Sequence, residues 1–180
     1  MRRSSVLVVL IAATAVLIAV LAWSVSTFDR TGVAFAFVVV WAPMTWLGTI
    51  SRVVTPRLPD RWHELHGFEL DGRLYERLGV RIVKRVLRRG PLAAFNPHLH
   101  LPDDPTPHRV AQLDQRMRDA EASHAILLIV TLAAAIAVVV SAAASRWTTA
   151  AWILLFDVLL NGYPVMLQRY NRALLRRRFG

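Results

Sequence analysis

The sequence contains no cysteine. A chain without cysteine forms no disulfide bond, has no thiol nucleophile and offers no thiolate ligand to a metal ion. Charged residues are also scarce, at 19% of the 180 residues, whereas 55% are hydrophobic and the mean hydropathy is +0.40. A composition this apolar excludes a disordered chain and argues against a soluble enzyme.

Four stretches of the sequence carry almost no charge, namely residues 6–25, 33–50, 125–145 and 147–167. At about 18–21 residues, each stretch is long enough to cross a hydrocarbon core of about 30 Å as a helix. We therefore predict an all-α integral membrane protein with four transmembrane helices. Its predicted parts are an N-terminal transmembrane hairpin in residues 1–55, a cytoplasmic or interfacial segment in residues 56–124, and a C-terminal transmembrane hairpin with a basic tail in residues 125–180.

The first stretch also resembles a signal peptide, because Arg2 and Arg3 precede an apolar run. This run is longer than the apolar core of a typical signal peptide, and Leu21-Ala22-Trp23 is a poor cleavage site. We expect residues 6–25 to be retained as a transmembrane helix, with a cleaved signal peptide as the alternative.

The net charge of +10 is distributed unevenly along the chain. Thirteen basic residues lie between the second and third stretches and five follow the fourth, whereas Arg30 and Arg146 are the only basic residues in the two short connections. The positive-inside rule places both termini and the middle segment on the cytoplasmic side of the cell membrane. Anionic headgroups attract such residues, so the charge gives no reason to expect a nucleic acid as partner.

The middle segment contains one region with helical periodicity. In residues 74–87 an apolar stripe recurs every four positions, flanked by basic residues; the stripe consists of Leu74, Leu78, Ile82 and Val86. This pattern predicts a short amphipathic helix in the headgroup layer. Residues 95–107 are rich in proline and histidine and are expected to form a loop. The histidines at positions 63, 66, 98, 100 and 108 are expected at the surface or the membrane interface.

Polar residues recur at matching positions in the predicted C-terminal hairpin. His124 lies 22 residues before Arg146, and Gln168 lies 22 residues after it. Equal lengths along antiparallel helices place both at one depth, with Glu121 one turn from His124. We therefore expect Glu121 and His124 to lie near the segment Gln168-Arg169-Tyr170-Asn171-Arg172.

This expected cluster has two interpretations. An imidazole beside a carboxylate can remove a proton from a hydroxyl, while amides and guanidinium groups stabilise an oxyanion or bind a phosphate. The alternative is that helix ends are simply polar and that the arginines anchor the helix at the membrane surface. A di-iron site would need a second Glu-x-x-His segment, and none is found, so we expect no metal.

The fourth stretch adds polar residues at membrane depth. Asp157 and Asn161 lie four positions apart, and Pro164 continues the same face towards Gln168. Asn161 is a candidate for the inner end of a substrate groove, whereas the alternative is interhelical hydrogen bonding. Pro164 is expected to kink the helix because it removes the backbone hydrogen bond to Leu160.

Three segments of the chain carry a resemblance to a known family. They are GRLYERLGVRIVK at residues 72–84, RDAEASH at residues 118–124 and NGYPVMLQRYNR at residues 161–172. From about residue 56 to 175 the sequence resembles the glycosyl-4,4'-diaponeurosporenoate acyltransferase family. The resemblance implies transfer of a fatty acyl chain to a sugar hydroxyl of a carotenoid glycoside, as in the last step towards staphyloxanthin.

The implied activity assigns roles to the clustered residues. His124 is the expected general base, oriented by Glu121. The residues expected to bind substrate or the oxyanion are Asn161, Gln168, Tyr170 and Asn171, and those expected to bind the phosphates of the donor are Lys84, Arg169 and Arg172. Acyl-CoA is the expected co-substrate, with no bound cofactor. The expected partners are the lipid bilayer, the acyl donor and a glycosylated lipid or carotenoid acceptor.

Two other functions stay open at this point. One is a different small membrane transferase that modifies another lipid with the same cluster. The other is a non-enzymatic four-helix membrane protein in which the polar residues only hold the helices together.

Overall fold

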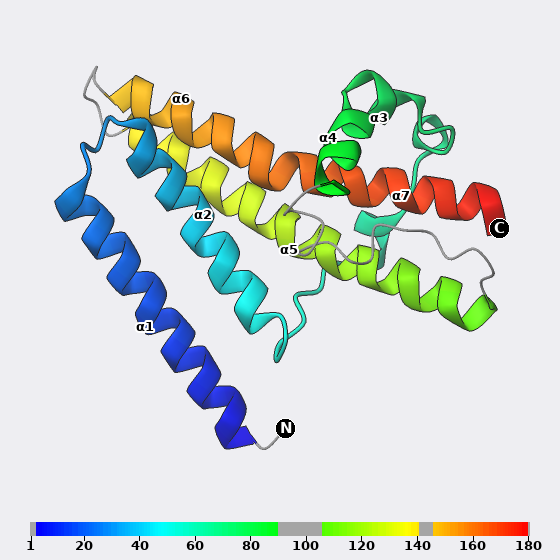
Figure 1. The fold of residues 1–180 in the computed structure, drawn as a ribbon, viewed down its shortest axis with the longest axis horizontal. Helices are drawn as coiled ribbons and strands as arrows, with labels where there is room; N and C mark the ends of the chain where they lie inside the picture. The colour runs from blue at the N-terminus through cyan, green and yellow to red at the C-terminus, as the bar shows by residue number, and fades with distance from the viewer. Residues whose placement is uncertain (1–2, 90–105, 141–145, 180) are drawn as a thin grey trace. The chain divides into compact units, whose positions relative to one another are not determined.

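The computed structural model describes residues 3–89, 106–140 and 146–179, and every element within these ranges is a helix (Figure 1). The long helices are α1 (Arg3–Thr27), α2 (Val33–Ile50), α5 (Pro107–Val140), α6 (Arg146–Asp157) and α7 (Tyr163–Phe179). The short ones are η1 (Asp60–His63), η2 (Gly67–Glu69), α3 (Arg73–Arg77), α4 (Val80–Leu87) and the π-helix η4 (Val158–Gly162). The prediction of an all-helical fold is confirmed for the described residues.

Four helices are long and apolar enough to cross a membrane, namely Arg3–Thr27, Val33–Ile50, Pro107–Ala137 and Trp147–Phe179. They correspond to the four predicted spans and indicate a multi-pass membrane protein. The third helix begins at Pro107 and runs without a proline or glycine into the apolar stretch at 125–145, and the fourth continues beyond residue 167 to Phe179. The end of the third predicted span, at 141–145, and most of the predicted loop at 95–107 lie outside the described residues.

The chain divides into two compact units. Unit 1 comprises Met1–Arg57 and Ser123–Gly162, and unit 2 comprises Leu58–Ala122 and Tyr163–Gly180. The boundary therefore falls within α5 and at the start of α7. The three predicted parts of the chain, residues 1–55, 56–124 and 125–180, are defined by the expected membrane boundaries and not by packing. They stay a prediction.

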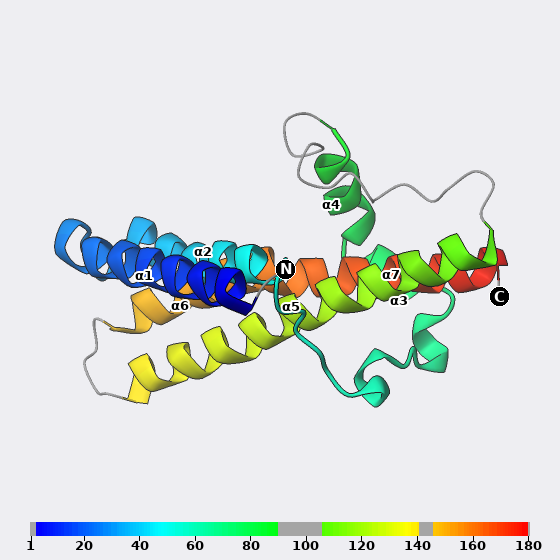
Figure 2. The same cartoon turned by 90° about the horizontal axis from the view of Figure 1, so that it is seen from below.

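Unit 1 is built from the most apolar helices. α2 packs on α1 and on α6, and Figures 1 and 2 both show α1 and α2 side by side. One core cluster joins α2, α5 and α6 through Ala36, Val40, Ala135 and Ile153. The two alanines let the helix backbones approach closely, as is typical of membrane-spanning helices. The indole of Trp46 also donates a hydrogen bond of 3.1 Å to the Thr14 hydroxyl, which joins α1 to α2.

Unit 2 packs its short helices against α7. Its core cluster combines Tyr75 of α3, Val80 of α4, and Leu167 and Tyr170 of α7. The hydroxyl of Tyr163 donates to the carbonyl of Leu78 at 3.0 Å, where α3 ends. These contacts fix α3 and α4 on one side of α7.

The prediction of a single amphipathic helix over residues 74–87 is wrong about its continuity. The structure contains two helices, α3 and α4, separated by Leu78 and Gly79. Gly79 has φ +79°, in the left-handed region that ends one helix and that only glycine adopts without a Cβ penalty. Val80 is fully buried, whereas Ile82 and Val86 of the predicted stripe are 65% and 55% exposed. The apolar stripe therefore remains, but it lies on two helices.

The break at Gly79 gives a first prediction. Gly79→Ala forces a Cβ into the left-handed region, so we expect a loss of about 1–2 kcal/mol in the free energy of unfolding. Thermal unfolding of the detergent-purified protein measures this loss. Gly67→Ala is the matched control, since Gly67 has no positive φ and its added Cβ meets no atom within 4 Å. Equal melting temperatures for the two variants contradict the explanation.

Candidate functional site

Glu121 is the centre of an ionic cluster in unit 2. Its Oε1 accepts a hydrogen bond of 2.7 Å from Nη1 of Arg169, and its Oε2 accepts one of 2.8 Å from Nη1 of Arg172. The side chains of Glu121 and Arg172 are fully buried. Asp114 accepts a further bond of 3.0 Å from Nε of Arg172. The predicted proximity of Glu121 to the segment 168–172 is thus confirmed.

Arg169 connects this cluster to the segment before α3. Glu69 accepts hydrogen bonds of 2.7 Å from both Nε and Nη2 of Arg169, and the carbonyls of Trp62 and Glu64 accept from Nη1 and Nη2. Burial opposes the ionisation of Glu69, but hydrogen bonds from Arg169, Tyr75 and His66 outweigh it and lower its pKa to about 2. Every N–H direction of the Arg169 guanidinium is used by a protein acceptor.

His63 belongs to the same cluster, although the sequence indicated a surface position. It is 5% exposed, and its carbonyl accepts a hydrogen bond of 2.7 Å from Nη2 of Arg172. Its Nδ1 lies 3.4 Å from Oε2 of Glu121, without the geometry of a hydrogen bond. Sequence analysis missed His63 because its partners, Glu121 and Arg172, lie 58 and 109 residues further along the chain.

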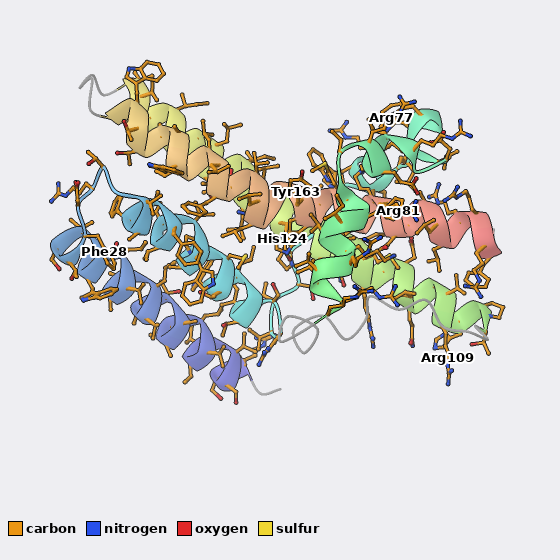
Figure 3. All side chains as sticks on the ribbon, turned by 45° about the horizontal axis from the view of Figure 1, so that its top comes forward. Phe28, Arg77, Arg81, Arg109, His124 and Tyr163 are labelled. Carbon is orange, nitrogen blue, oxygen red and sulfur yellow. The ribbon has the colours of Figure 1, made fainter. Side chains whose placement is uncertain are left out.

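A second polar group lies in unit 1, among the apolar helices. Asp157 accepts a hydrogen bond of 2.8 Å from the amide nitrogen of Asn161, and the amide oxygen of Asn161 lies 3.1 Å from Nδ1 of His124. Asn161 and Asp157 are buried, and His124, labelled in Figure 3, is half-buried. We call this arrangement the Asp157–Asn161–His124 chain.

The orientation of the Asn161 amide favours one tautomer of a neutral His124 imidazole. Because Asp157 accepts from the amide NH2, the amide oxygen faces His124, and Nδ1 is the ring nitrogen that donates to it. The backbone of Leu160 also hydrogen bonds to the imidazole. A neutral imidazole then has its lone pair on Nε2, the nitrogen that can accept a proton from a substrate. Asn161 and Asp157 are therefore positioned to set the tautomer of His124.

The local backbone at Asn161 is unusual. Residues Val158–Gly162 form a π-helical turn, η4, which ends two residues before Pro164, where the sequence predicts a kink. Pro164 has no N–H to bond the carbonyl of Leu160, so one hydrogen bond of a regular α-helix is missing at this point. Single π-helical turns occur frequently at functional sites.

The remaining predicted residues lie on or against α7 in unit 2. Asn171 is buried, and its amide oxygen accepts a hydrogen bond of 2.6 Å from Nζ of Lys84. The hydroxyl of Tyr170 donates to Glu76 at 2.9 Å, and Gln168 is half-buried. In the described part of the chain, no three His, Asp or Glu side chains are grouped closely enough to hold a metal ion.

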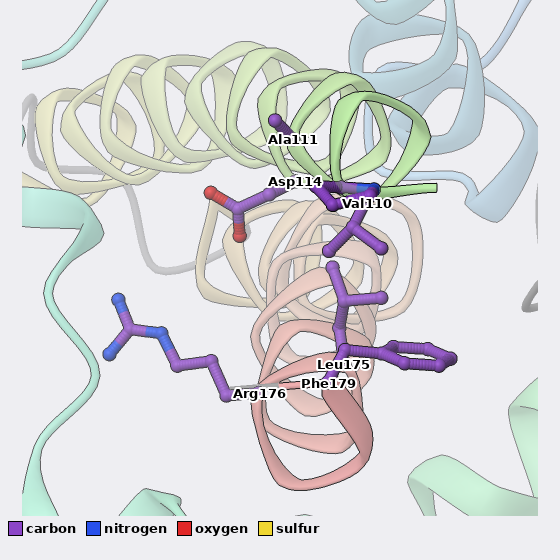
Figure 4. A pocket seen from close by; sticks show the side chains of 7 residues that line it. Val110, Ala111, Asp114, Leu175, Arg176 and Phe179 are labelled. Carbon is purple, nitrogen blue, oxygen red and sulfur yellow. The ribbon is translucent and has the colours of Figure 1, made fainter. Parts of the chain in front are cut away.

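Unit 2 also contains a largely apolar hollow between α5 and α7. This hollow has a volume of about 400 Å³. Figure 4 shows the side chains that line it, which belong to Pro107, Val110, Ala111, Asp114, Leu175, Arg176 and Phe179. The Asp114 carboxylate at its edge is held by Arg118 at 2.7 Å and by Arg172. Asp114 is thus part of the ionic cluster.

The sequence model of the glycosyl-4,4'-diaponeurosporenoate acyltransferase family matches residues 59–179, well over half of the chain. The chain belongs to this family. The predicted resemblance is confirmed, and membership assigns it to the acyltransferases of carotenoid biosynthesis. The matched region of this family member contains both the Glu121 cluster and the Asp157–Asn161–His124 chain. No curated protein and no solved structure matched significantly.

The Glu121 cluster gives a second prediction for this acyltransferase-family protein. In Glu121→Gln, one guanidinium faces an amide NH2 instead of an oxygen, and the buried arginines lose their shared negative charge. Breaking a buried ion pair from one side costs about 3–5 kcal/mol, so we expect a large loss of stability in thermal or denaturant unfolding.

Glu64→Gln is the matched control for this loss, because the Glu64 side chain is exposed. We expect its unfolding free energy to stay within about 0.5 kcal/mol of the wild type. A Glu121→Gln protein as stable as the Glu64→Gln control contradicts the structural importance of the cluster.

Proposed function

We propose that this protein is a membrane O-acyltransferase that moves a fatty acyl chain from a thioester donor to a hydroxyl of a glycosylated lipid or carotenoid. Acyl-CoA is the proposed donor. Family membership supports acyl transfer, and the Asp157–Asn161–His124 chain is the observation that carries the proposed chemistry. It combines a potential base with a fixed tautomer and lies among the apolar helices, where a lipid-like substrate dissolves.

In the proposed reaction, Nε2 of His124 removes the proton of the acceptor hydroxyl as its oxygen attacks the thioester carbonyl. The tetrahedral oxyanion then collapses, the carbon–sulfur bond breaks and the ester forms. The leaving thiolate takes the proton back from the imidazolium, so that no proton remains on the protein. Since the sequence has no cysteine, a cysteine acyl-enzyme is excluded, and direct transfer is the simplest route.

The contacts support a division of labour among the predicted site residues. Asn161 and Asp157 are proposed as positioning residues for His124. Glu121, Arg169 and Arg172 are paired with one another and with further groups of unit 2, which supports a scaffold role. The amides of Gln168 and Asn171 stay proposed oxyanion donors, and Tyr170 stays a proposed substrate contact.

The proposed base gives a third prediction. His124→Ala is expected to lower kcat for acyl transfer by about 10²–10⁴-fold, because proton removal belongs to the transition state. Initial rates with radiolabelled acyl-CoA and a glycosylated carotenoid, on detergent-purified variants of equal thermal stability, measure this loss. His108→Ala is the control, since His108 is an exposed histidine on the same helix and is expected to leave kcat unchanged.

The same assay distinguishes whether Asn161 positions His124 for catalysis or only stabilises the fold. Asn161→Ala is expected to lower kcat less than His124→Ala and to shift the pH at which kcat falls, because the tautomer is no longer fixed. If stable His124→Ala protein keeps the wild-type kcat, the assignment is wrong. The polar chain then serves as interhelical hydrogen bonding in a protein with other chemistry or none.

The orientation in the membrane is a separate proposal, supported by the charge distribution. With thirteen basic residues between the second and third spans and five after the fourth, we propose that both termini and the middle segment are cytoplasmic. Fusions of alkaline phosphatase after residues 30 and 179 test this fourth prediction. Activity is expected only for the fusion after residue 30, and the reverse pattern contradicts the proposed orientation.

A further inference from the structure

The basic residues of α4 form one continuous face. At 100° per residue, Arg81, Lys84 and Arg85, with Arg88 and Arg89 just after the helix, cover an arc of about 140°. Cations three or four residues apart repel each other along a helix. This face is therefore unfavourable in itself, and an anion that binds there would offset the repulsion.

The same face is hollowed in the folded protein. These five side chains and Tyr170 line a hollow of about 480 Å³, and none of the described residues that line it is a carboxylate. Arg81 lies 3.6 Å from Glu76, at the edge of this group, and the Tyr170 hydroxyl also bonds to Glu76. We call this feature the α4 hollow.

Lys84, the only lysine in the chain, forms the fixed part of the hollow. Its Nζ lies 5.5 Å from the centre of the Tyr170 ring and donates to the neutral amide oxygen of Asn171. Burial and the nearby charge of Arg88 lower the pKa of Lys84. In the described part of the chain, the residues that line the hollow with Lys84 include no carboxylate. An ammonium held in this way has N–H groups left for a ligand.

This situation contrasts with the arginines of α7. Arg169 and Arg172 were expected to bind donor phosphates, but Glu69, Glu121 and Asp114 already neutralise them. Among the described residues, Glu76, which lies 3.6 Å from Arg81, is the only carboxylate paired with a cation of this face. In unit 2, the positive charge available to an external anion is therefore at the α4 hollow rather than at these two arginines.

We propose that the α4 hollow binds phosphate groups, either those of the nucleotide part of coenzyme A or that of an anionic lipid headgroup. Arginine guanidinium groups pair with phosphate oxygens in a bidentate manner, and a lysine ammonium adds a point charge. A volume of about 480 Å³ accommodates more than one phosphate group. Only the choice of coenzyme A as a ligand rests on the proposed function.

The test is a calorimetric titration of the full-length protein, in nanodiscs of zwitterionic lipid, with coenzyme A. Arg85→Gln/Arg88→Gln removes two exposed cations from the hollow and is expected to raise the Kd by about tenfold, since two charge-assisted contacts are lost. The matched control Arg73→Gln/Arg109→Gln removes two exposed cations elsewhere in unit 2. The control Kd is expected to stay within about twofold of the wild type.

A second arm distinguishes the lipid as the source of phosphate. If the hollow holds a headgroup, added phosphatidylglycerol raises the melting temperature of the wild type and of the Arg73/Arg109 control, but not that of the Arg85/Arg88 variant. In that case coenzyme A binds both variants equally. If neither coenzyme A nor phosphatidylglycerol distinguishes the two variants, the phosphate site is overturned.

Failure of this inference is distinguishable from failure of the proposed function. Coenzyme A binding that depends on Arg85 and Arg88, without any acyl transfer, overturns the proposed activity and leaves the site. Acyl transfer with the same KM for acyl-CoA in both double variants, together with equal lipid responses, overturns the site and leaves the activity.

Discussion

One buried carboxylate, Glu121 on α5, meets two arginines of α7. Each of its oxygens accepts one charge-assisted hydrogen bond, so neither guanidinium is buried without a counter-charge. This requirement fixes the face that α7 turns towards the first part of α5. The other N–H groups of the arginines then reach Glu69, Asp114 and the carbonyls of Trp62, His63 and Glu64. The irregular segment before α3 is thereby tied to the same point.

Charge compensation distinguishes two groups of arginines in unit 2. Those of α7 that face α5 are neutralised inside the protein and hold it together. Those of α4 are exposed and share a face with each other, so their positive potential is directed outward. The two groups are indistinguishable by residue type, and the difference between them arises only from which carboxylates the fold brings near.

In unit 1, polar side chains are buried among apolar helices, so their hydrogen-bond partners must come from the protein itself. Asp157 hydrogen bonds with Asn161 and Asn161 with His124, and these bonds offset the cost of placing polar groups among apolar helices. The same arrangement leaves Nε2 of His124 as the basic nitrogen of the neutral ring. The π-helical turn places Asn161 in this chain, and Pro164, two residues after the turn, removes one hydrogen bond of a regular α-helix.

The sequence by itself determined the helical class, the four apolar spans and the family, because these depend on composition, segment length and local motifs. It also predicted, from helical rise and from the equal distances of His124 and Gln168 from Arg146, that Glu121 and His124 would both lie near the segment 168–172. The ion pairs confirm this for Glu121, whereas His124 hydrogen bonds with Asn161. The hydrogen-bond and ion-pair partners of the polar side chains depend on the tertiary structure. Burial of His63, neutralisation of Arg169 and Arg172, and the pairing of His124 with Asn161 each depend on side chains far apart in the chain. A glycine in the left-handed region likewise divided a helix that hydrophobic periodicity predicted as continuous, because periodicity records side-chain polarity and not backbone dihedral angles.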